Sequence, residues 1–328
     1  MSKKKKKDYS AFEDTLPLCP HFDKCGGCSL QKISYEKQLH IKEQEVKELL
    51  GISDETGRKR VFEGIIASPA VEAYRNKMEF TFGDEFKGGP FSLGLHMRGS
   101  FMNIVNITDC RLVHQDMNVI RNAAKDFFEK YYEIGQVSFR NNKSGKGYLR
   151  HLLIRRAHFT GEIMTALVTT SQYPQADEVE LLERFKDMLL GLNLEGTLTG
   201  IMHIVNDSTS DVVQSDRTDI LFGRDYIYEE LLGLRFRISV FSFFQTNSQG
   251  AQVLYEKARE YASNAKGTLY DLYSGTGTIA QLMSSCVEKV TGVEIVKEAS
   301  EAAKENAALN GIRNVEFIAD DVLHALDT

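Results

Sequence analysis

Alternating polar and apolar residues over the first two thirds of the chain predict short strands with helices between them. Residues 77–82 alternate strictly, and the turn-forming sequence Gly88-Gly89-Pro90 follows them. Further strands are expected at 93–97, 101–107, 148–157, 162–170 and 199–206, and helices at 35–50, 115–132 and 176–190. Strands of antiparallel appearance mixed with helices predict a central α+β domain over residues 51–240.

The pattern changes after about Phe241, where helices and short apolar strands begin to alternate regularly. Helices are expected at 248–263, 277–285 and 297–309, and strands at 268–273, 289–294 and 314–318. Strict alternation of this kind is typical of a doubly wound parallel sheet. We therefore expect residues 241–328 to form the first strands of a Rossmann-like domain, so that the fold class combines α/β and α+β parts.

The first fifty residues form two further units. Residues 1–16 contain the lysine run Lys3 to Lys7 and are expected to be a disordered basic tail. Residues 17–50 combine a cysteine-rich segment with the first helix. The apolar residues on or near one face of that helix are Leu39, Ile41, Val46, Leu49 and Leu50.

Composition restricts the class of protein. The chain has 328 residues, of which 42% are hydrophobic and 26% charged, as in a soluble globular protein of about two domains. No apolar run approaches the ~20 residues that cross a membrane, and no secretory signal follows the lysines. We expect a cytoplasmic monomer with reduced cysteines. The net charge of −6 means that any binding of nucleic acid must rest on a local patch.

A glycine-rich turn at the end of the strand expected at 268–273 indicates a nucleotide-like ligand. Gly275 and Gly277 allow a ligand to approach the backbone, and the following helix offers free N–H groups. Together with Ala280, these glycines also fit the dinucleotide fingerprint, so the turn alone does not identify the cofactor.

Acidic residues around the turn favour S-adenosylmethionine over a dinucleotide. Asp271 would repel a pyrophosphate, at roughly a few kcal/mol for charges ~4 Å apart, but would attract the ammonium of a methionine moiety. Glu294 ends the next strand, where a carboxylate can hold ribose hydroxyls. Asp320 and Asp321 follow the third strand and could bind an adenine amino group. The alternative is that each acid only caps a helix, which is less favoured for all of them together.

Four of the five cysteines suggest a metal site. Cys19, Cys25 and Cys28 are clustered, and Cys110 lies far downstream, while Cys286 is interpreted as a small buried residue. A redox pair, a zinc site and a [4Fe–4S] cluster are all compatible with four thiols. Spacing alone makes the cluster only modestly better than zinc.

Several motifs together resemble those of the RNA uracil-5 methyltransferase family, over nearly all of residues 17–328. Residues 19–31 read Cys-Pro-His-Phe-Asp-Lys-Cys-Gly-Gly-Cys-Ser-Leu-Gln and are highly specific for that family. Residues 74–79 (Tyr-Arg-Asn-Lys-Met-Glu), the pair Asp109-Cys110, and residues 241–247 (Phe-Ser-Phe-Phe-Gln-Thr-Asn) also match.

The resemblance implies two bound groups. It implies a [4Fe–4S] cluster held by Cys19, Cys25, Cys28 and Cys110. It also implies S-adenosylmethionine contacts by Gln245, Tyr273 and Glu294, to which the residue analysis adds Asp271, Gly275 and Gly277. A further family contact matches Asp321, for which Asp320 is an equally good candidate by spacing.

The resemblance further implies a covalent reaction, in which a cysteine adds to C6 of uracil and C5 takes the methyl group. The family's nucleophilic cysteine and its glutamate base match nothing up to Thr328, and Cys286 does not correspond to that cysteine. Residues 1–328 are therefore expected to be inactive as a truncated form, a fragment or a pseudo-enzyme. The expected substrate is RNA, with 23S rRNA favoured over tRNA. The alternatives are a tRNA enzyme and a non-catalytic iron–sulfur RNA-binding protein.

Basic residues between 140 and 160 are the candidate RNA clamp. Arg150, Arg155 and Arg156 are the expected RNA contacts, and no acid lies in the segment that holds them. Lys77, outside this segment, is a secondary candidate. The other members are Arg140, Lys143, Lys146, Tyr148, His151, His158 and Phe159. A plain basic strand, with Leu152, Leu153 and Ile154 in the core, explains the segment equally well.

Overall fold

A seven-stranded sheet forms the centre of the molecule. The computed structural model describes residues 9–16, 18–52, 62–172, 175–209 and 215–326, so the lysine run lies outside the described residues. The strand order is β3-β2-β1-β4-β5-β6-β7. The strands are β1 (Lys77–Asp84), β2 (Phe91–His96), β3 (Ile104–Asn106), β4 (Leu149–Arg156), β5 (Glu162–Thr169), β6 (Thr197–Val205) and β7 (Arg217–Gly223). All neighbours are antiparallel except β5 and β6, which are parallel.

The sheet is therefore mixed. The prediction of antiparallel strands is wrong for β5 and β6, which are parallel. Helix α3 (Gln175–Leu190) connects β5 to β6, and a helical crossover of this kind returns the chain in the same direction. The other neighbouring pairs described in this sheet are antiparallel.

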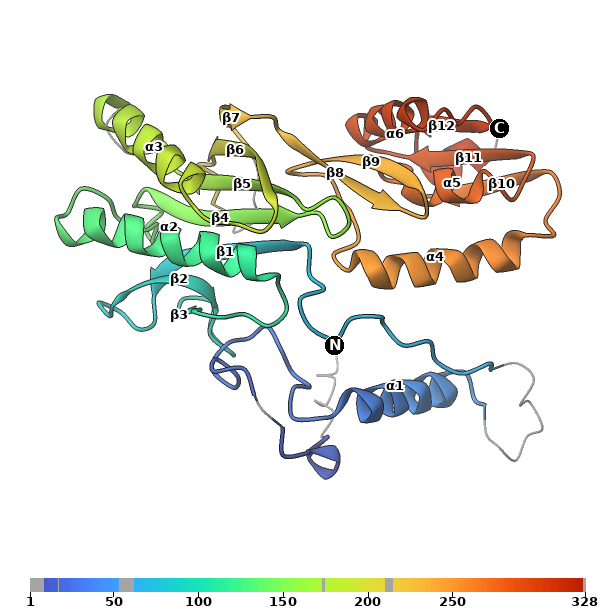
Figure 1. The fold of residues 1–328 in the computed structure, drawn as a ribbon, viewed down its shortest axis with the longest axis horizontal. Coiled ribbons are helices and arrows are strands. Elements are labelled where there is room, and N and C mark those ends of the chain that lie inside the picture. The colour runs from blue at the N-terminus through green and yellow to red at the C-terminus, as the bar shows by residue number, and fades with distance from the viewer. Residues whose placement is uncertain (1–8, 17, 53–61, 173–174, 210–214, 327–328) are drawn as a thin grey trace.

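Both faces of the sheet are covered (Figure 1). Helix α2 (Gln115–Glu133) and α3 pack on one face, where Phe80, Phe128 and Phe185 are fully buried. The other face packs against the hairpin of β8 (Tyr226–Leu231) and β9 (Leu234–Ser239) and against α4 (Ser248–Ala262). As a result, all eight residues of β4 are buried.

Strands β7, β8 and β9 were not predicted from the sequence. In β7 most side chains are exposed, so the strand lacks a buried apolar face that a pattern could reveal. In β8 a buried acid, Glu229, interrupts the apolar alternation. Its carboxylate accepts hydrogen bonds from the backbone N–H of His158 (2.7 Å) and Phe159 (2.9 Å) and from the hydroxyl of Ser248 (2.6 Å). These bonds tie the hairpin to the central sheet and to α4.

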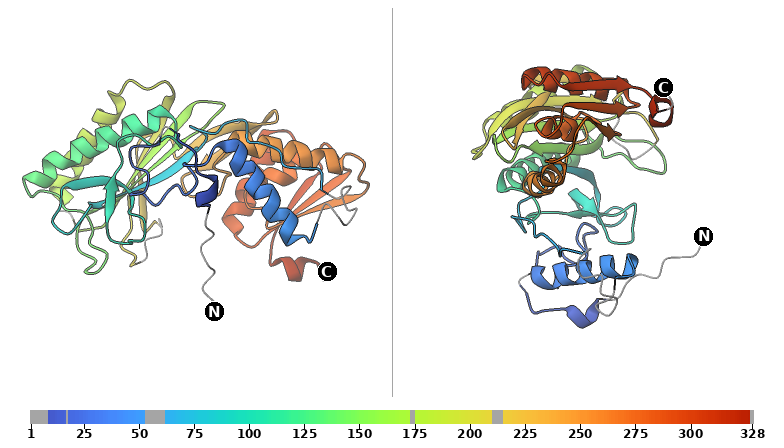
Figure 2. Two further views of the ribbon diagram at one scale, coloured as in Figure 1. Left: turned by 90° about the horizontal axis from the view of Figure 1, so that it is seen from below. Right: turned by 90° about the vertical axis from the view of Figure 1, so that its right-hand side faces the viewer.

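A smaller parallel sheet lies at the other end of the molecule, as Figure 2 also shows. Its strands are β10 (Thr268–Leu272), β11 (Lys289–Glu294) and β12 (Val315–Ala319), in that order. The helices are α5 (Thr278–Met283), α6 (Lys297–Leu309) and α7 (Val322–Leu326). The predicted alternation of strands and helices is confirmed for this part of the chain.

The N-terminal segment is more ordered than predicted. Ser10–Phe12 forms a 3-10 turn, and Asp14 accepts a hydrogen bond from the backbone N–H of Ser34 (3.0 Å), next to the start of α1 (Tyr35–Leu49). The described residues 9–16 are thus held in place and are not a free tail. In α1 only Ile41 is buried, while Leu49 is 85% exposed, so the expected apolar face is only partly used.

None of the helices in the described part of the chain combines the length and the apolar character that crossing a membrane requires.

Candidate cofactor site, cysteine cavity and basic strand

The carboxyl ends of β10, β11 and β12 bring the predicted acidic residues to one edge of the parallel sheet. Asp271 lies near the end of β10, Glu294 ends β11, and Asp320 and Asp321 follow β12. The backbone N–H of Asp320 donates to the carbonyl of Glu294 (3.1 Å), which joins two of these ends directly. In open α/β sheets, ligands bind outside such carboxyl ends.

The turn after β10 uses its two glycines for different reasons. Both have left-handed backbones, with φ of 54° at Gly275 and 73° at Gly277. A Cβ on Gly277 would lie 2.5 Å from the Phe317 ring and 2.8 Å from Cβ of Ala303, so this glycine allows close packing. A Cβ on Gly275 would meet no atom within 4 Å, so the space beside it is open.

Asp271 is a buried carboxylate that caps the helix after the turn. One oxygen accepts the backbone N–H of Ala280 at 2.9 Å, and the residue is only 9% exposed. Burial raises the pKa of Asp271, and the hydrogen bond from Ala280 partly opposes that rise. A cation bound beside Asp271 would offset the cost of burying its charge.

Glu294 holds the turn from the neighbouring strand. Its two oxygens accept the backbone N–H groups of Gly275 and Val296, each at 2.9 Å. A carboxylate has about four lone-pair sites, so this pairing leaves capacity for ligand hydroxyls.

Asp320 and Asp321 are tied into the start of α7. Asp320 accepts from His324 (2.7 Å), and this bond lowers the pKa of Asp320. Asp321 is exposed, and its carboxylate accepts the backbone N–H of Leu323 at 2.9 Å. The structure therefore does not distinguish between the two as a ligand contact.

Gln245 and Tyr273 lie near the same edge, and the structure adds Tyr255. Tyr273 is 74% exposed and has a left-handed backbone (φ 64°), an unusual conformation for a bulky residue. Tyr255 of α4 is buried and forms a side-chain hydrogen bond with Gln245. Burial raises the pKa of Tyr255, and the nearby charge of Asp271 raises it further.

Tyr255 thus contacts Gln245 and lies near the charge of Asp271. Its role could not be predicted from the sequence, because a tyrosine on the inner face of an amphipathic helix has the pattern of a core residue. The proximity of residues 245 and 271 could not be read from their spacing.

The four cysteines predicted to act together line one small cavity of about 20 Å³. Cys25 forms a β-bridge with Met97 after β2, and Cys110 precedes α2, where Asn118 binds its backbone N–H (2.9 Å). Burial raises the pKa of the Cys110 thiol to about 11, and the charges of Cys28, Cys19 and Cys25 add to that rise.

Burial also raises the pKa of Cys25 and of Cys28. All five cysteines are free thiols. Within the described ranges, no group of three or more His, Cys, Asp or Glu side chains is arranged so that it could hold a metal ion. The cluster prediction is therefore not confirmed, although the cysteines it joins share one cavity.

The basic strand β4 does not form the exposed clamp that was predicted. Arg150 and Arg155 are each 2% exposed and Arg156 is 8% exposed. Arg150 donates to the carbonyls of Asn206 (2.6 Å) and Ser208 (3.0 Å).

Arg155 and Arg156 are also engaged inside the protein. Arg155 donates to the carbonyls of Val240 (3.2 Å) and Ser242, and Arg156 to the carboxylate of Asp116 (2.8 Å). Burial lowers the pKa of Arg155 to about 10. Covering β4 on both faces leaves these guanidinium groups no free side toward RNA, so the clamp assignment is corrected for Arg155 and Arg156. Lys77 is half-buried and pairs with Glu79 at 2.6 Å.

Two sequence motifs instead pack against each other where the two sheets meet. Asn76 donates from its backbone to the carbonyl of Thr246 (2.8 Å). Its amide donates to the carbonyl of Gln245 and to the hydroxyl of Ser248, both at 2.8 Å. The motif at 74–79 thus positions residues 241–247 beside the cofactor edge.

Comparison with known proteins agrees with this architecture. A family model described as tRNA (Uracil-5-)-methyltransferase matches residues 203–325. An uncharacterized RNA methyltransferase of Clostridium tetani is 45% identical over 309 residues, which are 94% of this chain and 65% of the relative. One from Caldanaerobacter subterraneus is 45% identical over 317 residues, covering 95% of this chain and 67% of the relative.

A solved structure also aligns with most of the chain. It is that of Pyrococcus abyssi tRNA (uracil-54, C5)-methyltransferase in complex with S-adenosyl-L-homocysteine. It superposes with a TM-score of 0.66 and 26% identity, over 89% of this chain and 64% of that chain.

The large mixed sheet joined to a parallel sheet with a glycine turn resembles the fold of S-adenosylmethionine-dependent methyltransferases. Within that class, the chain belongs to the RNA uracil-5 methyltransferase family. It spans about 65% of the length of the Clostridium tetani relative.

Proposed function

We propose that this chain binds S-adenosylmethionine at the carboxyl edge of β10, β11 and β12, for methyl transfer to C5 of a uridine in RNA. The observation that carries the proposal is the turn held between two carboxylates. Glu294 binds Gly275, and Asp271 binds Ala280, so the backbone beside Gly275 is fixed and open. Such pre-organisation reduces the entropy lost when a ligand binds.

Each side chain at this edge has a distinct role in the proposal. Asp271 receives the ammonium group of the methionine moiety, and Glu294 accepts the ribose hydroxyls. Gln245 contacts the cofactor from residues 241–247, which we call the linker, and Tyr273 from the turn, while Asp321 or Asp320 accepts the adenine amino group. The bound cofactor supplies an electrophilic methyl group.

The uridine must be activated by a thiolate, because C5 of uracil is a poor nucleophile. Cys286 follows α5 and contacts the carbonyl of Arg259 (3.8 Å), near the start of β11 and away from the carboxyl edge. The other four cysteines line their own cavity. We therefore propose that residues 1–328 alone bind the cofactor without transferring its methyl group.

Titration calorimetry with S-adenosylhomocysteine tests the cofactor site. The 328-residue chain should bind one molecule, and Glu294→Gln should weaken binding at least about tenfold, the loss expected for a charge-assisted hydrogen bond of roughly 1.5–3 kcal/mol. Glu298→Gln, on the exposed first turn of α6, is the matched control and should bind normally. Equal effects of the two substitutions would contradict the site.

The same preparation tests the predicted inactivity. Tritiated methyl from S-adenosylmethionine should not enter uridine-containing RNA when only the 328-residue chain is added. Incorporation at C5 would show that the nucleophile lies within these residues.

We also propose that Cys19, Cys25, Cys28 and Cys110 hold a [4Fe–4S] cluster. Support comes from the four thiols that line one apolar cavity, since thiolates are the ligands of such clusters, and bound iron would favour the thiolates that burial alone disfavours. Anaerobically purified protein should contain iron and sulfide and absorb visible light, and Cys110→Ser should lose all three. Cys286→Ser is the control and should keep them. Zinc without sulfide would contradict the cluster.

For the RNA substrate we propose two candidates, 23S rRNA and tRNA. The sequence favours 23S rRNA. The structural neighbour from Pyrococcus abyssi is named as a tRNA enzyme, and this supports tRNA as the alternative. A non-catalytic iron–sulfur RNA-binding protein is the alternative. It would bind RNA, but deletion of its gene would not change the 5-methyluridine content of any RNA.

A further inference from the structure

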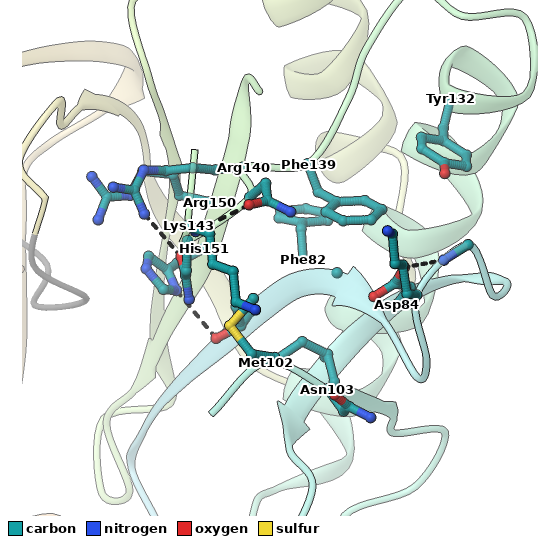
Figure 3. Close-up of a pocket in the computed structure, with 17 residues that line it drawn as sticks. Phe82, Asp84, Met102, Asn103, Tyr132, Phe139, Arg140, Lys143, Arg150 and His151 are labelled. Carbon is teal, nitrogen blue, oxygen red and sulfur yellow. Dashed lines mark hydrogen bonds between the residues drawn. The ribbon is translucent and has the colours of Figure 1, made fainter. Parts of the chain in front are cut away.

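A basic cavity of about 580 Å³ opens on the central sheet, away from the cofactor edge. It lies between the end of β1, the start of β4 and the end of α2, and loop residues 139–143 close one side of it. In Figure 3 the basic side chains Arg140, Arg150 and Lys143 gather on one side, with Phe82 and Phe139 at the centre.

The cavity is separated from the cofactor edge by the length of a strand. Asn76 lies just before β1 and contacts Gln245 and Ser248, whereas Asp84 at the other end of β1 lines the cavity. Eight strand residues span roughly 25 Å at ~3.3 Å per residue. A single small molecule therefore cannot occupy both places, but an RNA chain of several nucleotides can.

The lining is strongly unbalanced in charge. The lining contains four cationic side chains and one acidic side chain, Asp84. The carboxylate of Asp84 accepts the backbone N–H of Gly88 at 2.8 Å. The cations are Lys87, Arg140, Lys143 and Arg150. Lys87 and Lys143 are exposed, and neither forms an ion pair with any residue in the described part of the chain. Both ammonium groups are thus available to an anion.

Neighbouring polar groups add further hydrogen-bond donors. Arg140 donates to the side-chain oxygen of Asn142 (2.8 Å). The backbone N–H of Lys143 donates to the side-chain oxygen of Asn141 (3.0 Å). Since each amide oxygen already accepts a bond, the NH₂ groups of Asn141 and Asn142 remain to donate. The cavity therefore favours ligands rich in acceptors, such as phosphate oxygens and base carbonyls.

Aromatic rings complete the lining. Phe139 is half-buried and stacks on Tyr132, with ring centroids 5.7 Å apart and planes at 23°. Phe82 is buried between the sheet and α2. Cations beside aromatic rings are the combination that binds unpaired nucleotides, through phosphate contacts and base stacking.

We propose that this cavity binds a phosphodiester and an adjoining unpaired base of the substrate RNA, several nucleotides from the methylated uridine. The inference rests on the proposed function, since it takes RNA as the substrate. It assigns the RNA contact to Lys87 and Lys143, and not to the buried arginines of β4.

A matched pair of substitutions in one loop tests the proposal. Lys143 lines the cavity, whereas Lys146 is an exposed lysine of the same loop that does not. Fluorescence anisotropy should measure binding of a labelled RNA hairpin with unpaired uridines across a series of salt concentrations. Lys87→Ala/Lys143→Ala should weaken binding about tenfold and lower the salt slope by roughly 0.7, the value for one single-strand phosphate contact. Lys146→Ala should change neither.

The possible outcomes separate the inference from the proposed function. Equal effects of Lys143→Ala and Lys146→Ala, with RNA still bound, would overturn the cavity but leave the proposed function intact. Absence of RNA binding by a chain that still binds S-adenosylhomocysteine would overturn the RNA substrate as well. Uridine monophosphate and inorganic phosphate, titrated without RNA, identify the source of the phosphate. If uridine monophosphate or inorganic phosphate binds tightly and Lys87→Ala/Lys143→Ala leaves RNA binding unchanged, the cavity is a small-molecule site and the inference is overturned.

Discussion

Asp271 carries a charge that burial disfavours, and in the proposed site that same charge binds the cofactor. Its carboxylate is buried beside the turn and caps α5 through Ala280. Burial raises its pKa above the ordinary 3.8, so the folded state favours the protonated form. The stabilising contribution is present below the pKa of the unfolded chain and is lost as the pH rises through the raised pKa of the folded chain.

Asp271→Asn should therefore separate the two effects. The amide keeps an oxygen for Ala280 and removes the buried charge, so the free energy of unfolding at neutral pH should stay equal or rise. Affinity for S-adenosylhomocysteine should fall at least about tenfold, since the charge that attracts the ammonium is gone. Urea unfolding and calorimetry measure the two quantities. A loss of stability with unchanged affinity would mean that Asp271 is only a helix cap.

His203 should control the acid limit of stability. Its ring is fully buried on β6 and bonds to the hydroxyl of Thr169 at 2.7 Å, and burial lowers its pKa from 6.5 to about 4. A depressed pKa contributes stability above pH 6.5 that is lost as the pH falls toward 4. This loss is on the order of 3 kcal/mol at most.

His203→Gln should flatten the dependence of unfolding free energy on pH between 6.5 and 4, because glutamine does not titrate. Urea unfolding at several pH values measures the slope. A slope equal to that of the unsubstituted chain would show that other groups cause the acid sensitivity.

At the scale of elements, the glycine turn offers a matched pair of substitutions. Gly277→Ala adds a Cβ 2.5 Å from the Phe317 ring at a left-handed φ, so it should cost at least about 2 kcal/mol of stability from strain and overpacking. Gly275→Ala meets no atom within 4 Å and should cost only about 1 kcal/mol of backbone strain. Thermal unfolding of both variants tests this order, and equal losses would contradict the packing role of Gly277.

Strand β4 provides a second prediction about an element. Arg156 pairs with Asp116, which also accepts the backbone N–H groups of Glu195 (2.8 Å) and Gly196 (3.0 Å). Arg156→Gln leaves a buried carboxylate without its cation and should destabilise the chain by roughly 3–5 kcal/mol. RNA affinity of the folded fraction should not change. Weaker binding with normal stability would restore Arg156 as an RNA contact.

The sequence predicted local features of these elements well. Asp271, Gly275 and Gly277 lie within one strand–turn–helix unit, and Glu294 ends the strand that follows it, so their mutual placement follows from local geometry. The burial of Arg155 could not be predicted, because it depends on residues 226–262, which cover the second face of β4 from far along the chain. Tyr255 was missed because its position on α4 has the pattern of a core residue.

At the scale of the whole molecule, two sites lie at opposite ends of β1. Asn76 fixes the linker beside the cofactor edge at one end, and Lys87 and Lys143 line the basic cavity at the other. The central sheet thus acts as a rigid spacer between a proposed methyl donor and a proposed grip on RNA. Covering that sheet on both faces gives the spacer its stiffness.

We propose that this protein serves the methylation of uridine C5 in RNA. The direct measurement is mass spectrometry of 5-methyluridine in separately purified 23S rRNA and tRNA, from cells with and without the gene. Loss of the modification at one defined uridine, restored by the intact gene but not by a copy carrying Asp271→Asn, is the predicted result, and the RNA that loses it identifies the substrate. Unchanged 5-methyluridine at every site in both RNAs would contradict the claim.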